Sequence, residues 1–178
     1  MTTSAAEPDL RFPVGRATVP DADPAVYARL IDEIAEAPAR LRAALDGLSP
    51  EQLDTPYRDG GWTVRQVAHH VPDSHLNAYV RFKLALTEDA PRIKPYEEAR
   101  WAELPDAAMD PAVSLALLDA LHERWVTVLR AMTPEQFERT YDHPENGVTT
   151  LRAALGIYAW HGRHHVAHVT GLRERMGW

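Results

Sequence analysis

The segment Trp160-His161-Gly162-Arg163-His164-His165-Val166-Ala167-His168 carries four of the nine histidines in this 178-residue chain. Apolar residues recur around it at helical spacing from about 151 to 176, which predicts one long helix. Residues four apart share a helix face, so the segment offers two pairs, His161/His165 and His164/His168. Such a pair lets one helix give two imidazoles to one metal ion. We expect a metal site here, in preference to a solvated polar face.

The apolar stripe of this helix indicates which pair faces the core. At about 100° per residue, His165 falls about 20° from the centre of the stripe and His161 about 60°. His168 lies about 80° away, and His164, at about 120°, is predicted to point toward solvent. Buried imidazoles need partners, and a divalent cation would satisfy both members of the inward pair, His161 and His165. The stripe itself consists of Leu151, Leu155, Tyr158, Val169, Leu172 and Met176.

Three short segments, called the repeated phrases below, recur in the same order in the two halves of the sequence. Asp23-Pro24-Ala25-Val26 returns as residues 110–113, Ser49-Pro50-Glu51-Gln52-Leu53 as residues 133–137, and Thr63-Val64-Arg65 as residues 150–152, at offsets of 87, 84 and 87. Each phrase is typical of a helix start, with Asp, Ser or Thr at the N-cap and, in the first two, Pro at the first helical position. Several also fit the capping box. The chain is therefore predicted to be a structural repeat of two similar halves.

Helical periods follow these starts, and alternation typical of strands is scarce. We expect long helices over about 26–48, 64–86, 117–132 and 151–176, with Pro38 and Pro72 interrupting the first two. Residues 88–110 form the long crossover between the halves. The predicted fold is an all-α four-helix bundle of two similar helix pairs, with the metal site among facing helices. We expect a single domain over residues 1–178, of which 1–22 are an N-terminal extension.

The composition narrows the function. The chain has no cysteine, which excludes disulfides, thiolate metal sites and a cysteine nucleophile. Its formal charge of −7 argues against nucleic acid or an anionic membrane as the main partner. We find neither a signal-peptide pattern at the N-terminus nor an apolar run of about 20 residues, the length that a membrane span needs. These features predict a cytoplasmic protein that acts on a small molecule.

A catalytic zinc-type site has three protein ligands and one open position, so a third ligand is needed. The helix predicted over 64–86 is the repeat partner of the last helix and supplies His69, His70 and His75. Measured against its apolar stripe, His70 and His75 flank the stripe at similar angles, whereas His69 points away. Helical phase leaves the choice between His70 and His75 open. His122 and His143 carry no supporting pattern and are treated as structural or solvated.

Two segments resemble motifs of the DinB-like metal-binding superfamily. In residues 61–70, Gly61-Trp62-Thr63-Val64-Arg65-Gln66-Val67-Ala68-His69-His70, a His follows the Trp by eight positions, as in that superfamily's second-helix motif. Residues 158–165 resemble its H-x-x-x-H motif. The resemblance implies that His70, His161 and His165 are the metal ligands. Residues 53–58, 73–84 and 175–178 are similar to the YfiT group of metal-dependent hydrolases, which includes a bacillithiol S-transferase, and the similarity covers nearly the whole chain from Phe12 to Trp178.

This resemblance implies one divalent ion per chain, zinc first and nickel as the alternative. Three neutral imidazoles leave such an ion its full charge and an open position, where water or an external thiol could be activated. We therefore expect a metal-dependent enzyme, either a hydrolase or a transferase of a low-molecular-weight thiol. The sequence does not choose between the two, and the general base is not identified. A homodimer is expected, because a bundle often buries its remaining apolar surface by pairing and the resemblance points the same way.

Other roles for the site stay open at this point. A structural metal would require a fourth protein ligand, with His75 or His164 as the source, and a non-catalytic binding module would bind without turnover. Asp73 could orient the free ring nitrogen of His70, or lie on the helix surface. Arg81 and Arg163 could hold an acidic cosubstrate, or be ordinary surface residues. Trp160 could wall a pocket, or belong to the core.

Overall fold

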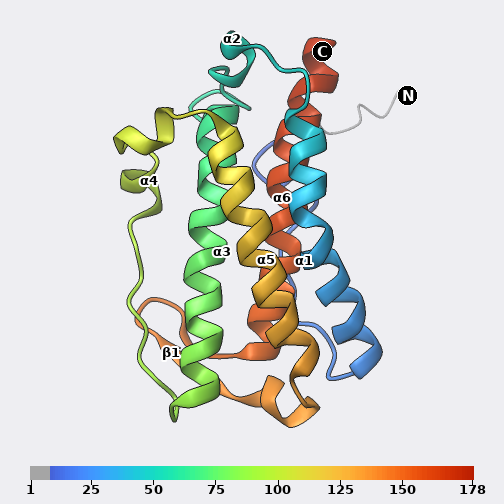
Figure 1. The fold of residues 1–178 in the computed structure, drawn as a ribbon, viewed down its shortest axis with the longest axis vertical. Coiled ribbons are helices and arrows are strands. Elements are labelled where there is room, and N and C mark those ends of the chain that lie inside the picture. The colour runs from blue at the N-terminus through green and yellow to red at the C-terminus, as the bar shows by residue number, and fades with distance from the viewer. Residues whose placement is uncertain (1–8) are drawn as a thin grey trace, which may run out of the picture.

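The computed structural model describes residues 9–178, and four long helices dominate it (Figure 1). α1 and α6 run in one direction along the long axis, and α3 and α5 run in the other. α1 and α3 each pack against both α5 and α6, so the helix pairs of the two halves interleave. The predicted all-α four-helix bundle is confirmed. The four helices are α1 (Pro24–Leu45), α3 (Val64–Thr87), α5 (Pro111–Ala131) and α6 (Leu151–Met176).

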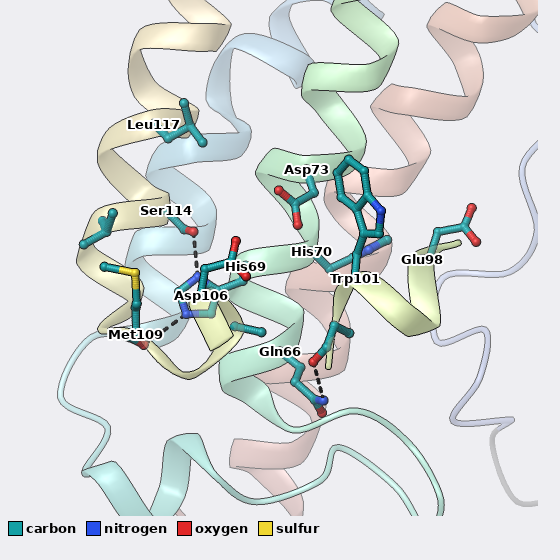
Figure 2. A pocket seen from close by; sticks show the side chains of 13 residues that line it. Gln66, His69, His70, Asp73, Glu98, Trp101, Asp106, Met109, Ser114 and Leu117 are labelled. Carbon is teal, nitrogen blue, oxygen red and sulfur yellow. Dashed lines mark hydrogen bonds between the residues drawn. The ribbon is translucent and has the colours of Figure 1, made fainter. Parts of the chain in front are cut away.

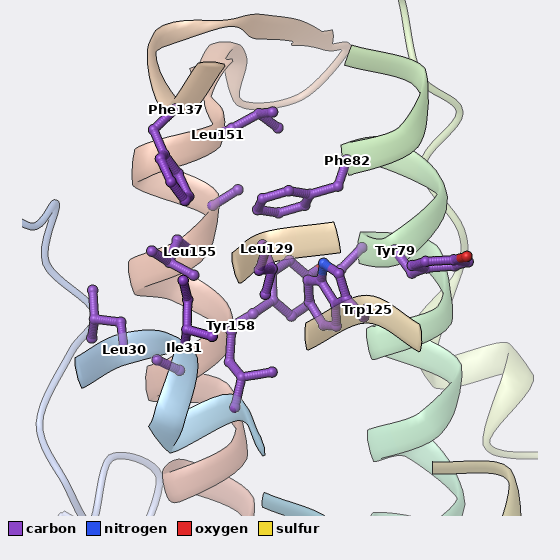
Figure 3. Close-up of a cluster of buried hydrophobic side chains, with 14 of the residues drawn as sticks. Leu30, Ile31, Tyr79, Phe82, Trp125, Leu129, Phe137, Leu151, Leu155 and Tyr158 are labelled. Carbon is purple, nitrogen blue, oxygen red and sulfur yellow. The ribbon is translucent and has the colours of Figure 1, made fainter. Parts of the chain in front are cut away.

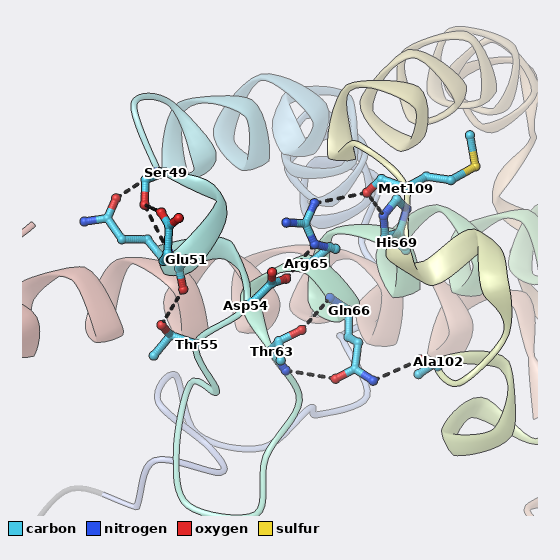
Figure 4. A network of polar contacts seen from close by, with 11 residues as sticks. Ser49, Glu51, Asp54, Thr55, Thr63, Arg65, Gln66, His69, Ala102 and Met109 are labelled. Carbon is cyan, nitrogen blue, oxygen red and sulfur yellow. Dashed lines mark hydrogen bonds and ion pairs between the residues drawn. The ribbon is translucent and has the colours of Figure 1, made fainter.

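The long helices begin at the caps that the repeated phrases predict. Asp23 accepts a hydrogen bond from the backbone N–H of Ala25 at 2.8 Å, and Asp110 accepts the equivalent bond from Ala112 at 2.8 Å. Thr63 and Gln66 form a reciprocal capping box at the start of α3 (Figure 4). These side chains satisfy N–H groups that have no partner within the helix, which fixes where each helix starts.

The connections contain elements that the sequence did not predict. The crossover carries α4 (Glu98–Trp101) and a short 3₁₀ helix, η1 (Pro105–Ala108), and Gln66 of α3 donates to the Ala102 carbonyl there at 2.9 Å (Figure 4). A two-stranded antiparallel hairpin precedes α6. Its strands have four residues each, too few for alternation to be recognised, and they flank a turn that ends at Gly147, where φ is +74°. The remaining elements are α2 (Pro50–Leu53), η2 (Pro134–Glu138), β1 (Thr140–His143) and β2 (Gly147–Thr150).

A layer of histidines separates two apolar clusters inside the bundle. One cluster, named the Trp125 cluster here, fills the end of the bundle near the hairpin (Figure 3). On α3 it begins at Ala78, whereas the second cluster ends at Val71. Between the clusters lies the histidine layer, contributed by α3, α5 and α6. The Trp125 cluster includes Leu30, Ile31, Phe82, Leu129, Leu155 and Tyr158; the second cluster includes Leu41, Val64, Val67, Leu118 and Val169; the histidine layer comprises His70, His75, His122, His161 and His165.

Residues 9–22 of the predicted N-terminal extension lie along α6. Trp160 donates from its indole nitrogen to the Gly15 carbonyl at 2.9 Å. A Cβ at Gly156 would lie 2.7 Å from Pro20, so this close approach requires glycine. Residues 1–8 of the extension lie outside the described part of the chain. Within residues 9–178, no helix has the length and apolarity needed to cross a membrane.

Candidate metal centre

The structure brings His70 of α3 together with His161 and His165 of α6. One ring nitrogen of each residue lies within 4.8 Å of those of the other two. Because α3 and α6 pack side by side, residues 91 and 95 positions apart in the sequence meet at one height of the bundle. His70 and His165 are buried, and His161 retains partial exposure. The pair that helical phase selected and the residue that the family resemblance selected therefore form one cluster.

The spacing of this cluster fits a tetrahedral divalent ion. The Nε2 atoms of His70 and His161 are 3.2 Å apart. Two imidazole nitrogens bound to one zinc ion at 2.0–2.1 Å with tetrahedral angles would be separated by about 3.3 Å. Nδ1 of His165 is buried without a hydrogen-bond partner among the described residues, so this ring is not fully held by protein groups. The His70–His161 pair therefore fits the ion, and a ring nitrogen of His165 lies within 4.8 Å of both.

Burial keeps the imidazoles neutral, as metal ligands must be. Desolvation and, to a smaller extent, the nearby His164 lower the pKa of His70 to about 4. Desolvation also holds the pKa values of His161 and His165 well below the usual range, with neighbouring histidines acting in the same direction. Near neutral pH, a divalent ion would therefore meet neutral imidazoles rather than imidazolium cations.

His75 lies next to the cluster, but both of its ring nitrogens are engaged by other histidines. Nε2 contacts Nδ1 of His161 at 3.1 Å, and Nδ1 contacts Nε2 of His122 at 2.8 Å. His75 is therefore not available as the fourth protein ligand that a closed structural site would need. His69 is buried rather than exposed, and it contacts Ser114 at 2.7 Å and the Met109 carbonyl at 3.0 Å, away from the cluster (Figure 2).

The prediction that His164 points toward solvent is wrong. His164 is 7% exposed and His168 is 3% exposed. The N-terminal segment covers this face of α6: the Phe12 ring lies 6.1 Å from that of His164, and the Arg11 carbonyl accepts from His168 at 3.4 Å. The ring of Tyr57 stacks on His168 at 3.9 Å. Helical phase describes one helix and cannot show which extended segment packs over it.

This covered face forms a second histidine group. One ring nitrogen each of His164, His165 and His168 also lies within 4.8 Å of the others. All three residues come from a single helix, and His164 and His165 are adjacent in sequence, so their Cβ atoms diverge by about 100° around the axis. The group on two helices, with its 3.2 Å nitrogen pair, has the spacing that a metal ion requires, and we treat it as the candidate centre.

A cavity of about 200 Å³ adjoins His70 on the side of α5 and the crossover (Figure 2). Three carboxylates line it, those of Asp73, Glu98 and Asp106, and Trp101 forms part of its wall. Burial raises the pKa of Asp73 to about 6, and the negative charge of Asp106 acts in the same direction. Asp73 makes no side-chain hydrogen bond to His70 within residues 9–178, so its predicted role of orienting that ring has no support. It instead faces the cavity.

The arginines singled out in the sequence have protein partners. Arg163 forms an ion pair with Glu33 of α1. Arg81 donates to the hydroxyl of Tyr158 at 3.4 Å. Trp160 is partly buried against the ring of His164, at 4.3 Å between centroids, rather than in the core. His122, which carried no pattern in the sequence, belongs to the histidine layer, and His143 is buried in the hairpin.

Comparisons with known proteins show relatives whose names include a metal-dependent activity. A protein from Bacillus mycoides named "Putative metal-dependent hydrolase" is 56% identical over 171 residues, covering 96% of this chain and 99% of its own. A protein of the same name from Bacillus cereus is 55% identical over 174 residues. These relatives match the chain over nearly its whole length and carry the name of an enzyme that depends on a metal.

Solved structures share the fold. YfiT from Bacillus subtilis, described as "a probable metal-dependent hydrolase with an unusual four-helix bundle topology", superimposes with a TM-score of 0.93 at 49% identity and covers 96% of this chain and 99% of its own. TT2238, a four-helix bundle protein, matches at a TM-score of 0.58 and 22% identity, which shows the fold alone. The family model of the DinB superfamily matches residues 33–169. The chain belongs to the DinB superfamily.

Proposed function

We propose that this protein is a metal-dependent enzyme in which His70, His161 and His165 hold one divalent ion, zinc or nickel. The observation that carries the proposal is the pair of Nε2 atoms 3.2 Å apart on two different helices, with a third imidazole beside them. The names of the relatives support a metal-dependent hydrolase. When bound, such an ion would lower the pKa of a water or thiol at its open position.

The donor set favours a reactive site over a closed structural one. The other two histidines of the layer, His75 and His122, have both ring nitrogens engaged in hydrogen bonds, so neither offers a fourth ligand. His70 lines a cavity of about 200 Å³, which gives small molecules an approach to the cluster. Three neutral ligands and an approach from solvent are what an exchangeable fourth position needs.

The cavity beside His70 is the proposed substrate pocket, with Asp73 as the group that moves a proton. A carboxyl with a pKa near 6 is partly protonated close to neutral pH, so it can both take up and release a proton there. Trp101 and Leu117 supply apolar wall to the same cavity. This arrangement suits a small molecule with an apolar portion and a group that gains or loses a proton during the reaction.

Water and a low-molecular-weight thiol remain two candidates for the nucleophile. The names of the relatives favour hydrolysis, whereas the absence of cysteine means that any sulfur nucleophile must arrive as a cosubstrate. A turnover screen of the zinc- or nickel-loaded protein tests the proposal, with electrophilic substrates offered in water alone, with bacillithiol and with other thiols. We expect turnover that disappears in His161→Ala; binding of the ion without turnover across the screen would favour a binding module.

Cobalt substitution distinguishes an open from a closed site. With three protein ligands, addition of a thiol should change the electronic spectrum of the cobalt-loaded protein, because sulfur enters the open position. A spectrum indifferent to thiols would support a structural metal instead. The expected homodimer stays a prediction, and sedimentation equilibrium should give about twice the 20.0 kDa mass of the chain if it is right.

A further inference from the structure

His75 and His122, which are not among the proposed metal ligands, connect His161 by hydrogen bonds to the far side of the bundle. His161 contacts His75 between Nδ1 and Nε2 at 3.1 Å. His75 contacts His122 between Nδ1 and Nε2 at 2.8 Å, and Nδ1 of His122 contacts the carbonyl oxygen of Ile34 at 2.6 Å. His75 is 0% exposed and His122 is 2% exposed, so water does not compete for these bonds. These hydrogen bonds form a histidine chain that crosses the bundle from α6 through α3 and α5 to α1.

The carbonyl at the end of this chain determines the position of every proton in it. A carbonyl oxygen only accepts, so His122 must carry its proton on Nδ1. Nε2 of the neutral His122 then accepts from Nδ1–H of His75, whose Nε2 accepts in turn from Nδ1–H of His161. Burial lowers the pKa of His122 to about 4 and that of His75 well below its usual range, which keeps both rings neutral. Nε2 of His161 is left as a bare lone pair facing His70.

A proline inside α1 makes the carbonyl available. In a helix the carbonyl of residue 34 would accept from the backbone N–H of residue 38, but Pro38 has none. The freed oxygen of Ile34 lies inside the bundle and accepts from His122 instead. A feature that the sequence suggests only as an interruption of a helix thus provides the fixed end of the histidine chain.

We propose that His75 and His122 are positioning residues that hold His161 in its Nδ1–H tautomer, so that Nε2 is directed at the metal ion as a ligand. This inference rests on the proposed ligand role of His161. Isolated imidazoles in water favour the opposite tautomer, with the proton on Nε2, which could not bind the ion through that atom. Because a backbone carbonyl takes up no proton, the histidine chain orients His161 and does not conduct protons away from it. Such outer partners commonly contribute 10–100-fold to metal affinity.

The test is long-range ¹H–¹⁵N NMR of histidine-labelled, metal-free protein, which reports which ring nitrogen carries the proton. We expect His161 and His75 protonated on Nδ1, with Nε2 of His70 as the donor across the 3.2 Å contact. In His75→Phe, His161 should lose this tautomer, and zinc affinity measured by competition with a chelator should fall about 10–100-fold. His75→Gln should rescue both, because its side-chain oxygen can accept from His161 and its NH₂ group can donate to His122.

His143→Phe is the matched control, since His143 is a buried histidine outside the chain, and it should change neither readout. An Nε2–H tautomer of His161 in the unmodified protein would overturn the inference without any variant. Equal tautomer and affinity in His75→Phe and the unmodified protein would overturn it as well. The expected tautomers together with weak metal binding or no turnover would support the positioning role while the proposed function fails, so the two failures can be told apart.

Discussion

The Trp125 cluster and the histidine layer lie in contact but depend on different physical interactions. The Trp125 ring meets His75 edge to face, with centroids 5.8 Å apart and an angle of 88°. In the Trp125 cluster, packing between apolar side chains has no directional requirement, and side chains of similar volume can replace one another. In the histidine layer, the hydrogen bonds of each imidazole depend on which of its two ring nitrogens carries the proton. The first region confers stability, whereas the second contains histidines that could hold a metal ion.

The largest effect on stability is expected in the Trp125 cluster. Trp125 is fully buried, and Trp125→Ala should lower the free energy of unfolding by about 3–5 kcal/mol. Urea denaturation followed by circular dichroism measures the change. Leu117→Ala on the exposed face of the same helix is the control and should stay within about 0.5 kcal/mol. Similar losses in the two variants would mean that the cluster does not stabilise the bundle as described.

Substitutions in the histidine layer should lower the affinity for the metal ion. His70→Ala, His161→Ala and His165→Ala should each weaken zinc binding more than about 100-fold, or about 2.8 kcal/mol, because each removes a proposed ligand. His164→Ala and His168→Ala should keep the ion, since their rings belong to the covered face of α6. Metal content by elemental analysis compares the five variants. Loss of the ion in His164→Ala and His168→Ala with retention in His161→Ala would assign the metal to the second histidine group.

The next effect is expected in the catalytic rate, at Asp73 beside the histidine layer. Asp73→Asn should lower kcat about 100-fold while leaving metal content unchanged, because the proposed general base is removed and no proposed ligand is lost. In the unmodified protein, the proposed activity should fall as pH drops below about 6, where the Asp73 carboxylate becomes protonated. The pH–rate profile of the variant should lack this fall. An unchanged profile in Asp73→Asn would show that another group moves the proton.

The effect of His122 on stability is small near neutral pH and grows as the pH falls. The pKa of His122 is about 4 in the folded protein and near 6.5 when unfolded, so the unfolded chain binds a proton first as pH falls. Between pH 6.5 and 4, His122 should therefore reduce the stability of the metal-free protein by about 1.4 kcal/mol per pH unit, with no contribution above that range. His122→Leu should remove this part of the slope in urea denaturation at pH 7, 6 and 5. If the free energy of unfolding changed equally with pH in His122→Leu and in the unmodified protein, this prediction would be contradicted.

Most of the bundle could be predicted from local signals. Asp23, Thr63, Asp110 and Thr150 cap the four long helices because each needs only its own neighbours in sequence to form the bond. The same holds for the bounds of α6, where apolar spacing and terminal Gly177 both act locally. The hairpin was missed because four-residue strands carry too little pattern.

The candidate site was only half predictable from the residues. Phase selects His161 and His165 because they share a helix, but it cannot separate His70 from His75, since α3 faces α6 on one side and α5 on the other. The family resemblance was needed to choose His70. The burial of His164 depends on an extended segment more than 140 residues earlier in the chain, which has no periodicity to reveal where it packs. The chain through His122 likewise requires four helices to be in place.

The central claim is that three imidazoles from two helices hold one divalent ion and leave one position open. X-ray absorption at the zinc edge of the zinc-loaded protein counts these ligands directly. We expect three imidazole nitrogens at about 2.0–2.1 Å and one further oxygen, which a sulfur at about 2.3 Å replaces when a thiol is added. Four imidazoles that do not change on addition of thiol would contradict it.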